Sequence, residues 1–148
     1  MLYCFKGKCD NTVMDSYRWY LQLKKPRWAP PASLFGPVWS VLYVIIIISF
    51  GFVFFNVATS IIPLVVAVPF ALNLVFNFSF TYIQFGLKSN RLASVDILLV
   101  LITLVWALVA VWPYLNWVSI INLPYLAWVL FATALQLKIT QLNRADEI

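Results

Sequence analysis

Hydrophobic and polar residues occupy long separate blocks of this chain instead of alternating along it. Asp, Glu, Lys and Arg are all absent from residues 28–87 and again from residues 97–137. A helix needs roughly 17–25 mainly apolar residues to cross a bilayer, and four segments satisfy this: 37–57, 63–85, 95–113 and 117–141. Because these runs are continuous, whereas the strands of membrane barrels alternate, they are predicted to be helices. The pattern predicts an all-α integral membrane protein, a bundle of four transmembrane helices.

Composition excludes a soluble fold. Of the 148 residues, 64% are hydrophobic and 10% are charged, against roughly 45–50% apolar and about 25% charged in soluble domains. A chain of this length is expected to form one domain. Within it we predict a cytoplasmic N-terminal segment (1–18), a Pro- and Trp-rich cytoplasmic loop (19–36), the transmembrane helical domain (37–141) and a cytoplasmic tail (142–148).

Charge predicts the orientation in the membrane. The 10 Lys and Arg residues lie before residue 37, between the second and third spans, or at and after residue 138. With four spans they all face one side, so both termini are predicted to be cytoplasmic. Nucleic acid is not expected as a partner, because the basic residues stand only where the hydrophobic runs stop. The predicted location is the cell (inner) membrane, as a multi-pass protein, or the mitochondrial outer membrane in a eukaryote.

The chain lacks the residues of conventional catalysis. It has no histidine, which excludes a Ser-His pair, an imidazole general base and a proximal histidine for haem iron. Cys4 and Cys9 are too few ligands for structural zinc and are predicted to be free thiols. Asp96 is predicted to cap, or to add negative charge to, the N-terminus of the third span.

Two kinds of side chain recur at helical spacing within the spans. In the second span, Asn73, Asn77, Thr81 and Gln84 share one face, which predicts either hydrogen bonds between helices or the polar wall of a ligand cavity. Aromatic stripes in the first and fourth spans predict either packing or a cavity for a large, flat, mostly apolar molecule. Pro124 is expected to kink the fourth span. The stripes consist of Trp39, Tyr43, Phe50 and Phe54, and of Tyr125, Trp128, Ala132 and Gln136.

The run "WYLQLKKPRWAPPASLFGPVWSVLY" at residues 19–43 resembles the signature of the tryptophan-rich sensory protein, or translocator protein, family. That signature reads approximately W-Y-x-x-L-x-K-P-x-W-x-P-P-x-x-x-x-x-P-V-W-x-x-L-Y. The runs "FNFSFTYIQFG" and "PYLAWVLFATALQ" are similar to two further family motifs in order and spacing. The resemblance extends from residue 18 to about residue 143.

The resemblance implies a helical membrane protein that binds porphyrin or haem as a ligand and requires no cofactor. By motif position it implies that Trp39 and Trp128 are pocket tryptophans, that Asn77 faces the ligand and that Ala132 is a small wall residue. Phe80 replaces a family tryptophan, and Leu137 replaces the tyrosine of a sterol pattern, so sterol binding is not expected. With the stripes and the loop, the predicted ligand-binding residues are Trp28, Pro31, Trp39, Tyr43, Asn77, Phe80, Trp128 and Ala132.

The family has five spans, and the place of the first is held here by a segment with Lys6, Lys8, Asp10 and Asp15, whose charges oppose insertion. We therefore expect either an altered start of the chain or a four-span variant. In a four-span variant one cavity wall would be open to lipid or supplied by a partner, which predicts a homodimer.

The stretch "LKKPRWAPP" at residues 23–31 has two compatible interpretations. Its cations anchor the chain at the cytoplasmic face and its prolines stop a helix. Alternatively, residues 26–31 form a stiff lid in which Trp28 caps the ligand while Lys25 and Arg27 contact the propionates of a porphyrin. The predicted function is a tetrapyrrole-binding sensor or transporter of hydrophobic small molecules. The alternative is a membrane enzyme that degrades porphyrin and uses the pocket tryptophans.

Overall fold

The computed structural model describes residues 11–143, and within that range the chain forms helices joined by short connections, with no strand. Four of these helical segments are long and apolar enough to span a membrane: Ala32–Ala58, Leu64–Gly86, Asn90–Val111 and Leu123–Leu142. The predicted all-α membrane fold is therefore confirmed. The elements are α1 (Asn11–Gln22), η1 (Ala32–Leu34), α2 (Phe35–Ala58), α3 (Leu64–Thr81), the π-helical turn η2 (Tyr82–Gly86), α4 (Asn90–Val111), α5 (Asn116–Ile121) and α6 (Leu123–Leu142).

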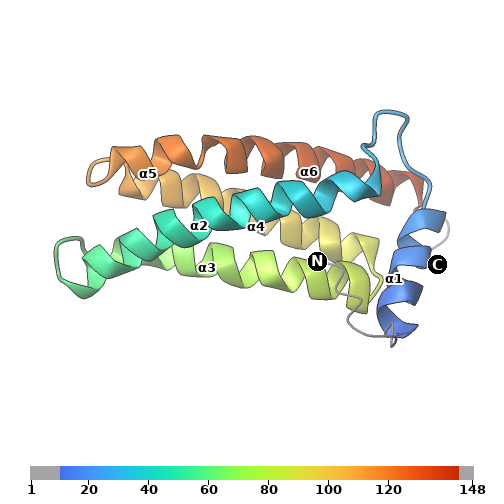
Figure 1. The fold of residues 1–148 in the computed structure, drawn as a ribbon, viewed down its shortest axis with the longest axis horizontal. Helices are drawn as coiled ribbons and strands as arrows, with labels where there is room; N and C mark the ends of the chain where they lie inside the picture. The colour runs from blue at the N-terminus through green and yellow to red at the C-terminus, as the bar shows by residue number, and fades with distance from the viewer. Residues whose placement is uncertain (1–10, 144–148) are drawn as a thin grey trace.

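The long helices lie side by side, and α1 lies across one end of the bundle (Figure 1). The same end holds the turn between η2 and α4 and the last turn of α6. The described parts of the chain thus begin and end at one side, as an even number of spans requires. The assignment of that side to the cytoplasm remains a prediction, and the predicted free thiols of Cys4 and Cys9 lie outside the described residues.

The bundle has an aromatic and aliphatic core and an apolar outer surface. The rings of Phe50 on α2 and Phe70 on α3 meet edge to face at 4.7 Å, and Leu104 on α4 is fully buried beside this cluster. Outward-facing side chains are also large and apolar, including Ile47 and Leu64. Apolar side chains both in the core and on the outside of the bundle suit a lipid environment, because a soluble protein would cover its outside with polar groups.

The fourth predicted span, 117–141, is wrong as a single helix. It is divided at Asn122 into α5 and α6, and at this position the Asn122 side chain donates to Ser49 Oγ at 2.9 Å and to the Val118 carbonyl at 2.8 Å. Pro124 lies in the first turn of α6, where its missing N–H costs no helical bond. The span is therefore interrupted next to Pro124, as expected, but Pro124 begins a new helix and does not kink a continuous one.

Asp96 does not cap a helix. The N-cap of α4 is Ser89, whose hydroxyl accepts from the Leu92 N–H at 3.4 Å. Asp96 lies in the second turn of α4, is 5% exposed, and its Oδ2 has no hydrogen-bond partner among the described residues. The prediction failed because α4 begins at Asn90, which the sequence pattern assigned to the preceding connection.

Candidate functional site

The polar face of α3 takes part in a hydrogen-bond network with α2, α4 and α6. Asn77 accepts from the Tyr43 hydroxyl at 3.2 Å and donates to the Tyr125 hydroxyl at 2.8 Å. Tyr125 in turn donates to Asn73 Oδ1 at 3.0 Å, and Asn73 donates to the Val100 carbonyl at 2.9 Å. Both asparagines and Tyr125 are buried. Of the two interpretations of this face, hydrogen bonding between helices is therefore confirmed for Asn73 and Asn77.

A separate apolar cavity of about 630 Å³ lies between α2 and α6. We call it the α2–α6 groove. Its volume falls within the roughly 300–1,000 Å³ of small-molecule pockets, and Val41 on its edge is 63% exposed, so the groove opens outward. The lining consists of Pro37, Val38, Val41, Leu42, Pro124, Ala127, Trp128 and Phe131.

Aromatic rings surround Trp128 in the groove. Phe35 meets its indole edge to face at 5.6 Å, and Phe131 lies at 5.5 Å on the next turn of α6. Phe131 also contacts the Trp28 ring at 5.8 Å. The Trp128 Nε1 donor is buried and has no hydrogen-bond partner among the described residues. Because buried indole N–H groups usually find a partner, this donor is an unusual feature of the residues around the groove.

Trp39 borders the network rather than the groove. Its indole lies 5.4 Å from the Tyr43 ring and 6.4 Å from the Tyr125 ring. The two predicted pocket tryptophans therefore lie in different surroundings. Trp39 stands beside buried hydroxyls and amides, whereas Trp128 stands in an apolar cavity that opens outward.

The predicted ligand-binding residues consequently fall into three sets. Trp39, Tyr43 and Asn77 belong to the network, while Trp28 and Trp128 meet through Phe131. The remaining three, Pro31, Phe80 and Ala132, do not line the groove. Pro31 is exposed and accepts from the Leu34 N–H at 3.0 Å, which starts η1, while Phe80 and Ala132 are half-buried on α3 and α6.

The loop that carries the predicted lid is held by contacts just before the lid, at Lys24 and Lys25. The Asn143 amide accepts from the Lys24 N–H at 3.0 Å and donates to the Lys24 carbonyl at 2.9 Å. The Lys25 ammonium lies 4.0 Å from the centre of the Tyr20 ring, and partial burial lowers the pKa of Lys25. Arg27 is exposed, and Trp28 is 51% exposed while it leans on Phe131. The loop thus sets two cations at the same end of the bundle as the tryptophan that contacts Phe131.

Comparison with known proteins gives the family. Residues 3–142 match the TspO/MBR family. The chain belongs to this family. The tryptophan-rich protein TspO of Bacillus cereus is 41% identical over 85 residues, which are 57% of this chain and 54% of that protein. The chain therefore spans about half of that relative.

Two further relatives match over longer stretches. The tryptophan-rich protein TspO of Archaeoglobus fulgidus is 32% identical over 146 residues, with 89% of this chain and 84% of that protein covered. The human translocator protein is 31% identical over 121 residues, or 71% and 69% of the two chains. The resemblance inferred from the motifs is thus confirmed, and the TspO/MBR match begins nearer the N-terminus, at residue 3, than the motifs do.

Sequence reasoning missed part of this TspO/MBR protein's groove. Phe35 and Phe131 were not among the predicted residues, although both contact Trp128. Phe131 could have been found from its spacing, since residues three apart on a helix are neighbours. Phe35 could not, because its contact depends on how α2 lies against α6. Tyr125 was placed in an aromatic stripe, but its role as the centre of the network had no sequence signal.

Proposed function

We propose that this TspO/MBR protein binds a tetrapyrrole, such as a porphyrin or haem, in the α2–α6 groove and acts as a sensor or transporter of hydrophobic small molecules. The observation that carries the proposal is the Trp128 indole, a large flat ring in an apolar cavity whose buried donor has no partner in the part of the chain that the structure describes. A macrocycle matches these features because it offers a flat apolar face for stacking and polar atoms at its edge. No cofactor is required for binding.

The loop supplies a reason why the ligand would be a dicarboxylate. Lys25 immediately precedes a turn that is closed by the bond from the Ala29 N–H to the Pro26 carbonyl at 3.0 Å. Arg27 lies within this turn, next to Trp28. Charge-assisted bonds to propionates would come from these cations, and Arg can make a bidentate pair. Trp28 would cover the ligand from the end of the bundle, since it already contacts Phe131.

A fluorescence titration with protoporphyrin tests the assignment. Trp128→Phe keeps a ring but loses the donor and part of the stacking area, which predicts binding weaker by about tenfold. Trp106→Phe is the matched control, because Trp106 faces outward on α4 and lines no part of the groove. The Trp39→Phe, Trp128→Phe double variant should behave like Trp128→Phe. If Trp128→Phe binds as tightly as Trp106→Phe, the site is wrong.

The charge role needs its own comparison. Lys25→Ala combined with Arg27→Ala should weaken protoporphyrin binding more than binding of a neutral apolar ligand, because only the porphyrin carries propionates. Equal weakening of both ligands would remove the charge role and leave the cations as membrane anchors. Illumination of the complex adds a further result: loss of porphyrin absorbance that depends on both Trp39 and Trp128 would favour a degrading enzyme, and intact pigment would favour a binder.

A further inference from the structure

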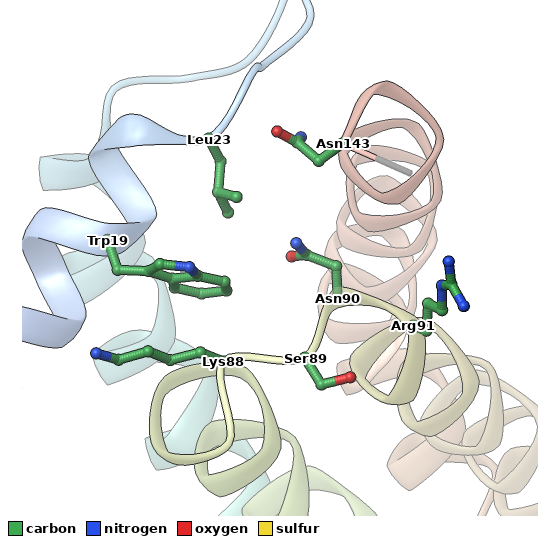
Figure 2. Close-up of a pocket in the computed structure, with 7 residues that line it drawn as sticks. All are labelled: Trp19, Leu23, Lys88, Ser89, Asn90, Arg91 and Asn143. Carbon is green, nitrogen blue, oxygen red and sulfur yellow. The ribbon is translucent and has the colours of Figure 1, made fainter. Parts of the chain in front are cut away.

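A second cavity lies at the end of the bundle that α1 crosses, away from the α2–α6 groove. Its volume is about 410 Å³, and Trp19 from α1, the turn before α4 and Asn143 at the end of α6 form its walls. Figure 2 shows the Asn90 amide directed into the space between Trp19, Leu23 and Asn143, with Lys88 and Arg91 extended to either side. We call this cavity the interfacial pocket.

Hydrogen bonds fix the walls of the interfacial pocket. The Asn143 amide makes two bonds to the backbone of Lys24, at 3.0 and 2.9 Å, and so ties the end of α1 to the end of α6. On the opposite wall, the Asn90 carbonyl accepts from the Thr140 hydroxyl at 3.0 Å. These bonds join three elements that are distant in sequence. The pocket is therefore formed before any ligand arrives, which lowers the entropic cost of binding.

The lining of the interfacial pocket has the chemistry of an anion site. Among the residues that the structure describes, the lining includes the two cations Lys88 and Arg91 and no carboxylate. Ser89 adds a hydroxyl, which accepts from the Leu92 N–H and keeps its own proton for donation. In Figure 2 the charged ends of Lys88 and Arg91 lie on opposite sides of the cavity and point away from it. A bound anion would therefore require both long side chains to turn inward, where the guanidinium matches the geometry of phosphate oxygens.

The position of the interfacial pocket along the bundle narrows the choice of anion. It lies at the turn where the spans Leu64–Gly86 and Asn90–Val111 both end, so it lies at the depth of lipid headgroups. Basic pockets between transmembrane helices at this depth bind the phosphate of anionic lipids. Trp19 in the wall is also typical of headgroup depth.

We propose that the interfacial pocket binds a phosphate group, carried either by the headgroup of an anionic phospholipid or by a soluble phosphate. The Lys88 and Arg91 side chains hold the phosphate oxygens, and Trp19 packs against the attached group. This pocket shares no lining residue with the α2–α6 groove. Phosphate binding can therefore be tested independently of tetrapyrrole binding.

The test uses the full chain in lipid nanodiscs. In discs of phosphatidylcholine with phosphatidylglycerol, native mass spectrometry of the released protein counts retained phosphatidylglycerol. The Lys88→Gln, Arg91→Gln variant should retain about 25-fold less, from roughly a fivefold loss for each cation near a membrane surface. Arg18→Gln with Lys138→Gln removes the same charge from exposed residues outside the pocket and should retain as much as the wild type.

A second arm separates the two sources of phosphate. In discs of phosphatidylcholine alone, inorganic phosphate should raise the thermal midpoint of the wild type, but not of Lys88→Gln, Arg91→Gln, if the ligand is soluble. The Lys88→Arg, Arg91→Lys variant keeps both charges and should bind as the wild type does, which shows that loss of binding is not loss of fold. Equal lipid retention by both charge-removal variants, or no effect in either arm, would overturn the proposal.

Discussion

Tyr125→Phe tests the hydrogen-bond network with the loss of one oxygen atom. The Tyr125 hydroxyl is fully buried and makes two bonds, accepting from Asn77 at 2.8 Å and donating to Asn73 at 3.0 Å. Hydrogen bonds between membrane helices contribute on average about 0.6 kcal/mol each and at most about 1.7 kcal/mol. The variant also leaves Asn73 Oδ1 without its donor, so we expect a loss of about 1–2 kcal/mol of folding free energy.

The assay is thermal unfolding in a mild detergent, followed by the near-ultraviolet circular dichroism of the aromatic residues. A loss of about 1–2 kcal/mol corresponds to a midpoint lower by about 3–6 °C for a chain of this size. Tyr43→Phe removes a single longer bond, at 3.2 Å and only half-buried, and should lower the midpoint by about 1–2 °C. Tyr114→Phe alters an exposed tyrosine at the far end of α4 and serves as the control. A Tyr125→Phe midpoint equal to that of Tyr114→Phe would refute the network as a source of stability.

Three further predictions concern charge and assembly. Asp96→Asn should keep or raise the thermal midpoint, because it removes a buried charge whose Oδ2 has no hydrogen-bond partner within residues 11–143. A fall larger than that of the exposed Asp15→Asn would show that Asp96 has a partner. Burial lowers the pKa of Lys25, so its attraction for a dicarboxylate porphyrin is present below that pKa and is lost as the pH rises through it. In porphyrin titrations across alkaline pH, the affinity of Lys25→Arg should therefore depend less on pH than that of the wild type, because arginine stays charged. We also propose a homodimer that covers the open side of the groove, so cysteine cross-linking through Val41→Cys in a bilayer should trap dimers, and monomer alone would contradict this.

The spans could be predicted from sequence because lipid imposes a strong and local constraint. Charged residues are costly in the bilayer core, so their absence alone located the segments that became α2, α3 and α4. The division at Asn122 could not be predicted in this way. At this position the Asn122 side chain donates to the Val118 carbonyl and also reaches Ser49 on α2, 73 residues away in the sequence. A hydropathy pattern contains no information about such a contact.

The candidate site was predictable only as far as single helices determine it. The spacing of Asn73 and Asn77 placed them on one face, and the structure agrees. Their partner Tyr125 lies 52 and 48 residues away, so the pairing depends on how α3 and α6 are set against each other. The groove likewise depends on how far apart α2 and α6 lie, and a sequence motif gives no information about that distance. Motif resemblance supplied Trp39 and Trp128 as a pair, but not their different surroundings.

The network and the groove are nevertheless linked through α6. Tyr125 and Trp128 are three residues apart, so they share one turn of this helix and project from neighbouring parts of its surface. The two bonds of Tyr125 fix the rotation of α6, and this rotation directs Trp128 into the groove. The buried amides therefore act on the proposed ligand through position rather than contact. It follows that Tyr125→Phe should weaken protoporphyrin binding less than Trp128→Phe does, and that a larger effect from Tyr125→Phe would place the ligand inside the network instead of in the groove.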